Sequence, residues 1–294
     1  MGISGSLISG QLWSRVAKAA TICAKVLLLS LLAQSGKAQT VAVTHCRGEC
    51  PRYESIVTAN QSNLVIHHVY AASVSGETAL PDWVAYRLSK DAIGVASLLP
   101  RTWQPDRLIK FSPLEDIVQA GEAELRLSES ITRNANPYGG TAAVLTKPEN
   151  RTRLAPITSF ANTAYWSDLN NFSNMVPMPL DLRMGPWLQL EQRLNNLVAV
   201  GNEAYVITGP IYLIAGLSLA PSTADINPGA YYKLVSDESG VVAFVFPQDA
   251  NRYENFCAYR ADLADVEDMT DLEFFPNRGS IATSTSLLGF LGCQ

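Results

Sequence analysis

The sequence predicts an α+β fold, because two kinds of local pattern alternate along the chain. Short runs of β-branched and aromatic residues, bounded by Gly, Pro and Ser, are typical of strands. Stretches with apolar residues near a 3.6-residue period, or rich in Ala, Glu and Leu, favour helices. The 294 residues are 47% hydrophobic and 17% charged, so the chain can bury a sizeable core, and no linker divides it.

Residues 1–38 have the composition of a secretory signal peptide. They contain no acidic residue, and the apolar run VLLLSLLA leads to small residues at Gly36 and Ala38. That run is far shorter than the roughly 20 residues that span a bilayer. We therefore expect cleavage before Gln39, one domain over residues 39–294, no transmembrane segment in the mature chain, and a periplasmic or secreted location. An uncleaved signal anchor is the alternative.

Removal of this segment leaves an acidic protein. The full sequence has 22 Lys and Arg residues and 27 Asp and Glu residues, and residues 1–38 hold four of the basic residues and none of the acidic ones. The remaining 18 basic and 27 acidic residues give a formal charge of −9. Because this charge opposes the long-range attraction of nucleic acid, any nucleic-acid binding has to arise close to a local basic site.

Two strands are predicted early in the mature chain, at Asn63–Tyr70 and Trp83–Leu88. Ser75, Gly76 and Pro81 lie between them and favour a turn. We therefore expect the two strands to form an antiparallel hairpin with a long connection.

The only histidines in the sequence are His45, His67 and His68. The last two are adjacent on a predicted strand and should point to opposite faces. A strand histidine is most often hydrogen-bonded in or beside the core, and a substitute general base is the alternative.

The rest of the chain predicts three helices and three strands. The span Phe111–Lys147 favours a helix until a Gly- and Pro-containing stretch breaks it. A second helix begins near Pro186 and continues through Gln189–Leu197, with Trp187 facing the core. The third helix, Ala261–Phe274, has an acidic face that is typical of a solvated surface rather than a metal site. The strands are Ala204–Ile214, Tyr231–Asp237 and Val241–Asp249.

Three blocks between Asn150 and Glu191 carry the most specific pattern in the sequence: NRTRLAPITSF, YWSDLNNFSNMVP and LDLRMGPWLQLE. In this order and spacing they resemble the site of the DNA/RNA non-specific endonucleases, the Serratia-nuclease type of the ββα-metal (His-Me finger) superfamily. The resemblance covers almost all of the chain after residue 38. It implies an α+β domain whose central, mainly antiparallel sheet is flanked by helices.

The cysteines left after residue 38 are Cys46, Cys50, Cys257 and Cys293. An even number in an exported chain favours disulfides, and four cysteines allow three pairings. The resemblance implies that Cys46 pairs with Cys50 and that Cys257 pairs with Cys293. A zinc site at the first pair with His45 would lack a second close pair of ligands.

Two positions of the site differ from the family pattern. The family places Asp-Arg-Gly-His shortly before Ala-Pro, whereas this chain has NRTR before LAP, which puts Arg153 at the histidine position. The family also places a metal-binding Asn four residues before a Trp and eight before a Glu. Here Arg183 takes the Asn position before Trp187 and Glu191.

These two arginines remove the groups that the family chemistry needs. In the family, as the resemblance implies, the histidine takes a proton from water and the Asn holds a magnesium ion, which keeps most of its water ligands. A guanidinium stays protonated and has no acceptor lone pair, so Arg153 cannot act as the base. The charge of Arg183 would repel a divalent cation, and Glu191, which orients metal-bound water in the family, could pair with Arg183 instead.

Three asparagines could offer a relocated metal ligand. Asn170, Asn171 and Asn174 lie close in sequence within the second block. Such residues more often hold the backbone of a loop through side-chain hydrogen bonds, and we expect that role here.

We therefore expect a hydrolytically impaired nuclease-fold protein, a pseudoenzyme without a cofactor. It would bind nucleic acid or another phosphate-bearing ligand through Arg101, Arg151, Arg153 and Arg183, with Arg101 matching an arginine that the family places near the substrate phosphates. The alternative is an active endonuclease that hydrolyses DNA and RNA with Mg²⁺ and a relocated base and ligand. A structural or inhibitory partner that keeps the fold and binds no ligand is a third possibility.

Overall fold

The computed structural model describes residues 43–60, 62–76, 80–109, 151–212, 228–279 and 281–293. These residues belong to one compact unit that begins at Ala42. The expected signal peptide and the helix expected within Phe111–Lys147 lie outside the described residues.

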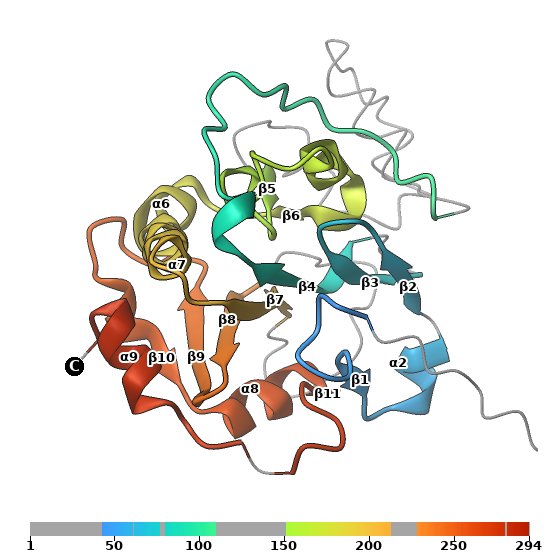
Figure 1. The fold of residues 1–294 in the computed structure, drawn as a ribbon. Helices are drawn as coiled ribbons and strands as arrows, with labels where there is room; N and C mark the ends of the chain where they lie inside the picture. Colours follow the sequence, from blue (N-terminus) through green and yellow to red (C-terminus); the bar gives the residue numbers. More distant parts are fainter. Residues whose placement is uncertain are drawn as a thin grey trace, which may run out of the picture. The chain divides into compact units, whose positions relative to one another are not determined.

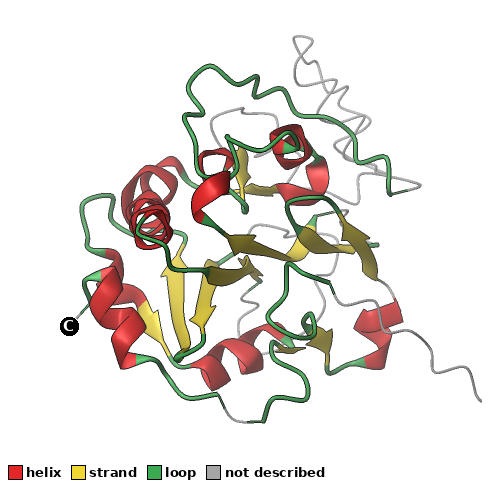
Figure 2. Ribbon diagram, in the orientation of Figure 1, coloured by secondary structure: helices red, strands yellow, loops and turns green. Residues whose placement is uncertain are grey.

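A seven-stranded sheet forms the centre of this unit (Figures 1 and 2). Every neighbouring pair of its strands runs antiparallel. In spatial order the strands are β10 (Arg260–Ala261), β9 (Gly240–Pro247), β8 (Ala230–Asp237), β7 (Ala204–Ile211), β4 (Pro81–Leu88), β3 (Ala71–Ser75) and β2 (Ser62–Ile66). The predicted α+β fold with a mainly antiparallel sheet flanked by helices is confirmed.

The predicted hairpin between the first two strands is wrong in its pairing. β3 lies inside the segment that we expected to be a connection, and it pairs with β2 on one side and β4 on the other. Its sequence AASVS has low intrinsic strand propensity, but four of its five residues are buried, so packing outweighs propensity. The first strand ends at Ile66, which leaves His67 and His68 beyond it.

The later elements agree closely with the predictions. β7, β8 and β9 fall on the three predicted strands, and the helix expected near Pro186 continues as α7 (Leu188–Ala199). Trp187 is 1% exposed, as predicted for a core residue. The acidic helix is α8 (Leu263–Thr270), which buries one residue, Val266.

The sheet separates two apolar layers, because side chains alternate between its faces. On β8, Tyr231 and Val235 face one layer, and Tyr232 and Leu234 face the other. The first layer includes residues of α7 and of the C-terminal helix α9 (Thr285–Leu291), and the second includes Val266. A charged side chain that faces inward from β8 is therefore surrounded by packed side chains.

Short elements complete the described part of the chain. They are β1 (Arg52–Tyr53), α2 (Ile56–Asn60), β11 (Leu272–Glu273) and 3-10 helices at Lys90–Ala92, Ile157–Ser159, Trp166–Asn170, Phe172–Asn174 and Phe256–Tyr259. Among the described residues, no helix has the length and apolar character needed to cross a membrane.

Both expected disulfides are confirmed. Cys46 is bonded to Cys50 in the loop at the start of the described chain, and Cys257 is bonded to Cys293 just after α9. The second bond joins residues 36 positions apart and fastens the C-terminal helix to the segment that follows β9. Two disulfides fit a protein that folds in an oxidising compartment.

Candidate functional site

The three sequence blocks form a two-stranded hairpin followed by a helix. β5 (Arg151–Arg153) pairs antiparallel with β6 (Met175–Pro177), and the chain continues through α6 (Leu180–Leu182) and a π-helical segment (Arg183–Trp187) into α7. Arg183 Nη1 donates a hydrogen bond of 3.1 Å to the carbonyl oxygen of Arg151. This ββα arrangement, visible in Figure 1, therefore places the first and third blocks in direct contact.

A glycine allows a kink inside the π-helical segment that precedes α7. Gly185 has φ −105° and ψ −120°, which are not helical values, and Pro186 follows it without a backbone N–H. A Cβ at Gly185 would lie 2.6 Å from the carbonyl oxygen of Arg252, so only glycine allows this close approach of the loop after β9. The kink lets Arg183 reach β5 while the next helix packs on the sheet.

Arg153 is held by the residues around it. Its Nη2 donates to Asn170 Oδ1 at 2.6 Å and to the carbonyl oxygen of Arg101 at 2.8 Å. The centre of the guanidinium lies 4.0 Å from the centre of the Trp103 ring, a cation–π contact. Burial, and then the charges of Arg101 and Arg183, lower the pKa of Arg153 to about 10. The side chain is therefore a cation at neutral pH, close to two others.

Glu191 is buried and paired with a lysine from the central sheet. Lys233 Nζ donates to Glu191 Oε1 at 3.0 Å and lies 3.9 Å from the centre of the Trp187 ring. Lys233 is 0% exposed and Glu191 is 9% exposed. Burial raises the pKa of Glu191 and lowers the pKa of Lys233, and their mutual attraction opposes both shifts. The sequence left open a pairing of Glu191 with Arg183, and the observed partner is Lys233.

A family model described as DNA/RNA non-specific endonuclease matches residues 51–280 of the chain. The chain belongs to this family. It is 28% identical over 253 residues to a nuclease of Serratia marcescens, a match that covers 82% of this chain and 84% of that protein. It is 24% identical over 225 residues to a nuclease of Nostoc sp., with 73% of each chain covered.

A solved structure shows the same fold. One chain in the crystal structure of the EndoG/EndoGI complex, which concerns the mechanism of EndoG inhibition, matches with a TM-score of 0.51 and 18% identity. The match covers 72% of this chain and 84% of that chain. At this identity the match shows the fold alone, and that fold is the ββα-metal nuclease fold.

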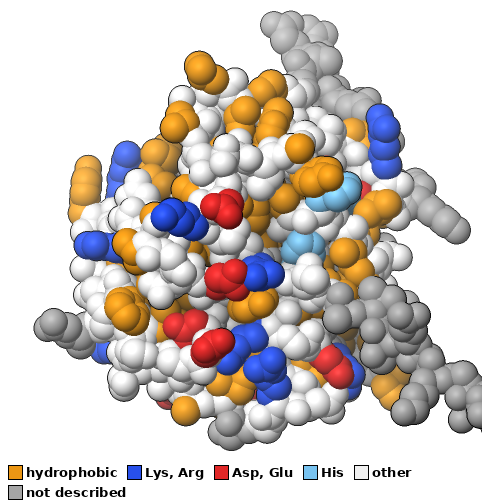
Figure 3. Space-filling model, in the orientation of Figure 1, with side chains coloured by type: hydrophobic (Ala, Val, Ile, Leu, Met, Phe, Trp, Pro, Cys, Tyr) orange, Lys and Arg blue, Asp and Glu red, His pale blue; other side chains and the backbone are white. Residues whose placement is uncertain are grey.

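The four arginines named from the sequence differ in exposure within this endonuclease fold. Arg101 is exposed, Arg153 and Arg183 are half-buried, and Arg151 is only 3% exposed. The structure thus brings Arg101, Arg153 and Arg183 together near the surface. The side chain of Arg151 is buried. On the face shown in Figure 3, basic and acidic side chains are interspersed, which limits any broad electrostatic attraction of nucleic acid.

The three asparagines of the second block hold the loop between β5 and β6. Asn174 Oδ1 accepts from the backbone N–H of Ala155 at 2.8 Å, and its Nδ2 donates to the Ala155 carbonyl oxygen at 3.0 Å. Asn171 Oδ1 accepts from Gln104 Nε2 at 2.9 Å, and Asn170 Oδ1 accepts from Arg153 Nη2. These bonds support the expected role of backbone and loop positioning.

Two histidines pair with aspartates. His67 Nε2 lies 2.8 Å from Asp106 Oδ2, with both side chains almost inaccessible to solvent. His68 Nδ1 lies 3.0 Å from Asp168 Oδ2, and its exposed ring stacks on Tyr165 with 3.9 Å between ring centres. His67 is thus the hydrogen-bonded histidine beside the core that we expected, and His68 is a surface residue.

Neither Lys233 nor Trp103 was predicted from the sequence as a residue of the site. Only the burial of Lys233 could have been predicted. In the predicted strand Tyr231–Asp237, alternation places Lys233 on the same face as Tyr231 and Val235, so a buried charge and a buried partner could have been predicted. Trp103 contacts Arg153 across 50 positions of sequence, and no local pattern indicates that contact.

Proposed function

We propose that this chain is an exported, hydrolytically impaired member of the DNA/RNA non-specific endonuclease family that binds nucleic acid or another phosphate-bearing ligand through arginines of its ββα site. The observation that carries the proposal is the environment of Arg153. This side chain takes the position of the family histidine, and its guanidinium is fixed by Asn170, the Arg101 backbone and Trp103.

The site lacks a general base at that position. A pKa of about 10 leaves Arg153 protonated at neutral pH, and a guanidinium offers no lone pair that could take a proton from water. Loss of a general base typically slows a reaction about a hundredfold to ten-thousandfold. The position can therefore bind an anion but cannot activate a nucleophile.

The residues present also do not fit a magnesium ion. Magnesium binds oxygen ligands, and position 183 offers a guanidinium instead. The Glu191 carboxylate is buried against Lys233, and the amide oxygens of Asn170 and Asn174 accept hydrogen bonds within the protein. The proposal therefore involves no step that depends on a metal.

Phosphate binding uses the three arginines near the surface. Arginine binds phosphate through two parallel hydrogen bonds, and an anion between Arg101, Arg153 and Arg183 would relieve the repulsion that lowers the pKa of Arg153. The buried side chain of Arg151 has no place in this contact. Because the mature chain is acidic overall, binding should depend on these local contacts and weaken as salt is added.

The first test is a cleavage assay. Purified residues 39–294 are incubated with plasmid DNA or RNA, with Mg²⁺ or with a chelator. We expect cleavage at the background level in both conditions. Magnesium-dependent cleavage that the chelator stops would contradict the proposal and support the active-enzyme alternative. His68→Gln would then show whether the exposed histidine bonded to Asp168 serves as a relocated base.

The second test measures oligonucleotide binding by fluorescence anisotropy over a range of salt concentrations. Arg101→Gln should weaken binding and reduce the salt slope by about 0.7, the value for one lost phosphate contact to a single strand. Arg193→Gln, which removes an exposed arginine of α7, is the matched control and should change neither quantity. Equal effects of the two changes would show that binding is general electrostatics rather than binding at the ββα site.

A repair experiment tests whether the loss is local. Arg153→His combined with Arg183→Asn should restore some magnesium-dependent cleavage, whereas either change alone should restore little, because base and metal act in the same step. Circular dichroism confirms that each variant is folded. A folded double variant that does not cleave would contradict a defect confined to these two positions.

A further inference from the structure

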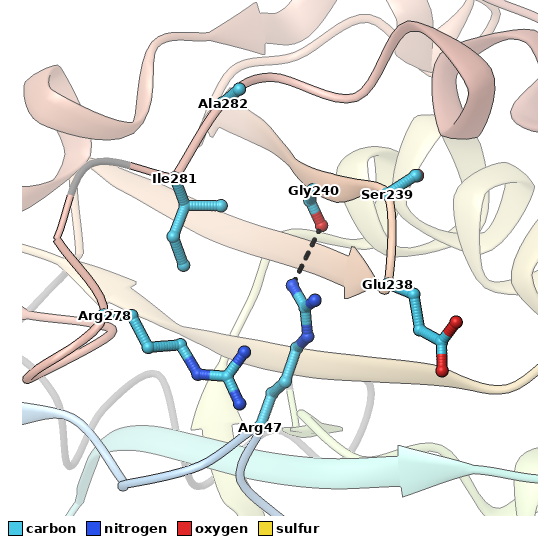
Figure 4. Close-up of a pocket in the computed structure, with 7 residues that line it drawn as sticks. All are labelled: Arg47, Glu238, Ser239, Gly240, Arg278, Ile281 and Ala282. Carbon is cyan, nitrogen blue, oxygen red and sulfur yellow. Dashed lines mark hydrogen bonds between the residues drawn. The ribbon is translucent and has the colours of Figure 1, made fainter.

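A second basic pocket lies at the turn between β8 and β9 (Figure 4). Its volume is about 300 Å³, the lower end of the range of roughly 300–1,000 Å³ that is usual for small-molecule sites. It is lined by Arg47, Glu238, Ser239, Gly240, Arg278, Ile281 and Ala282. None of these residues belongs to the ββα site.

Two arginines from distant parts of the sequence reach into this pocket. In Figure 4 the side chain of Arg278 extends toward that of Arg47, whose guanidinium points to the Gly240 carbonyl, and Glu238 lies on the other side of Arg47. Gly48 has φ +94°, and a Cβ there would lie 2.9 Å from Arg278 Nε, so the second guanidinium packs against the residue next to Arg47. Two like charges are therefore held close together.

Neither guanidinium forms an ion pair with a carboxylate of the described residues, although Asp237 and Glu238 lie near enough to Arg47 to oppose the lowering of its pKa. Arg47 Nη1 donates to the carbonyl oxygen of Gly240 at 3.4 Å, and across the described ranges the guanidinium of Arg278 makes no hydrogen bond or ion pair. Burial, and then the charge of Arg278, lower the pKa of Arg47, which agrees with this closeness. An anion in the pocket would remove the repulsion and supply the missing acceptors.

The walls of the pocket are fixed to one another. The disulfide between Cys46 and Cys50 closes the short loop that carries Arg47. Asn277 Nδ2 donates to Glu49 Oε1 at 2.9 Å, which joins the segment containing Arg278 to the same loop. A pocket whose loops are already fixed binds with a smaller entropic cost, because the ligand does not have to order the backbone that carries the two arginines.

We propose that this pocket binds a small phosphate-bearing anion, with the phosphate oxygens placed between Arg47 and Arg278. The planar guanidinium matches the geometry of phosphate and can donate two hydrogen bonds at once. Ile281 supplies an apolar wall beside the two cations. The shared chemistry is the phosphate group, which free phosphate or the terminal phosphate of a mononucleotide can provide.

Calorimetric titration of residues 39–294 with inorganic phosphate and with a nucleoside 5′-monophosphate tests this site. Wild type should bind at least one of the two saturably, and Arg278→Gln should weaken binding about tenfold or more, as expected for one lost charged hydrogen bond. Because the Arg278 side chain is exposed and makes no bond in the described structure, this variant should fold normally. Glu238→Gln should strengthen binding, since it removes a nearby negative charge.

Two controls separate this pocket from the ββα site and from general charge effects. Arg193→Gln removes an exposed arginine outside both sites and should leave the affinity unchanged, and in an Arg101→Gln background, which weakens the ββα site, Arg278→Gln should still cause its loss. Tighter binding of the mononucleotide would identify a nucleotide ligand, and equal binding would identify free phosphate. An absence of saturable binding, unchanged affinity in Arg278→Gln, or an equal loss in Arg193→Gln would overturn the proposal, whatever the outcome of the oligonucleotide experiment.

Discussion

Breaking the buried ion pair between Lys233 and Glu191 should cost far more stability than breaking an exposed pair in the same sheet. Lys233→Met leaves the Glu191 carboxylate buried without its partner, and breaking a buried pair in this way costs about 3–5 kcal/mol. The matched control is Arg87→Gln, which breaks the pair between Arg87 and Glu203, whose side chains are 41% and 51% exposed. Exposed pairs are worth about 0–1 kcal/mol, so the control should change stability little.

Urea denaturation of the two single variants and of Lys233→Met/Glu191→Leu measures these differences. The double variant should recover most of the lost stability, because replacing both charges with apolar side chains leaves no buried charge. A loss in Lys233→Met no larger than the loss in Arg87→Gln would refute the reasoning. So would a double variant that is less stable than Lys233→Met, because the losses would then simply add.

The same variant should show a new pH dependence. Lys233 is the main influence that opposes the upward shift in the pKa of Glu191, so its removal raises that pKa further above the unfolded value of 4.5. The folded variant then retains a proton that the unfolded chain releases. Its stability should therefore fall as pH rises above about 4.5 and until the folded pKa is passed. Denaturation at pH 5 and pH 8 checks the sign, and Lys233→Met/Glu191→Leu should lack this dependence.

Two further predictions concern stability. Replacing Cys257 and Cys293 with serine should lower the free energy of unfolding by about 4 kcal/mol, which is the chain-entropy value for a bond between residues 36 positions apart. Thermal or urea denaturation measures this loss, and an unchanged midpoint would contradict the prediction. Burial raises the pKa of Asp82 to about 7 despite a hydrogen bond from Tyr53, so this carboxyl lowers stability as pH rises from about 4 to 7. Asp82→Asn should remove that dependence, and a difference from wild type that is the same at pH 5 and pH 8 would count against it.

The sequence predicted the fold well where local patterns and packing agree. β8 and β9 combine β-branched and aromatic residues with Gly and Pro boundaries, and both strands form where expected. β3 was missed because Ala and Ser do not indicate a strand, and its burial between β2 and β4 is a tertiary effect.

The site was predicted in position but only partly in its contacts. The helix predicted from Pro186 onward carries Glu191 as α7, whereas the hairpin that carries Arg153 was not predicted. The partner of Glu191 comes from a strand 42 positions away, and the ring beside Arg153 comes from before the hairpin, so neither contact has a local signature. Long-range pairing depends on the folded arrangement of the sheet, which periodicity does not specify.

The contacts of Arg153 also determine how much stability a substitution at this position would cost. Replacing Arg153 with histidine would withdraw the donor from Asn170 Oδ1, whose residue is 5% exposed, and would end the contact with Trp103. An unsatisfied buried acceptor alone costs about 1–3 kcal/mol, so histidine at this position should lower the stability of the folded chain. The arginine is therefore tied to its neighbours, and a change at this position alters the stability of the fold as well as the chemistry of the site.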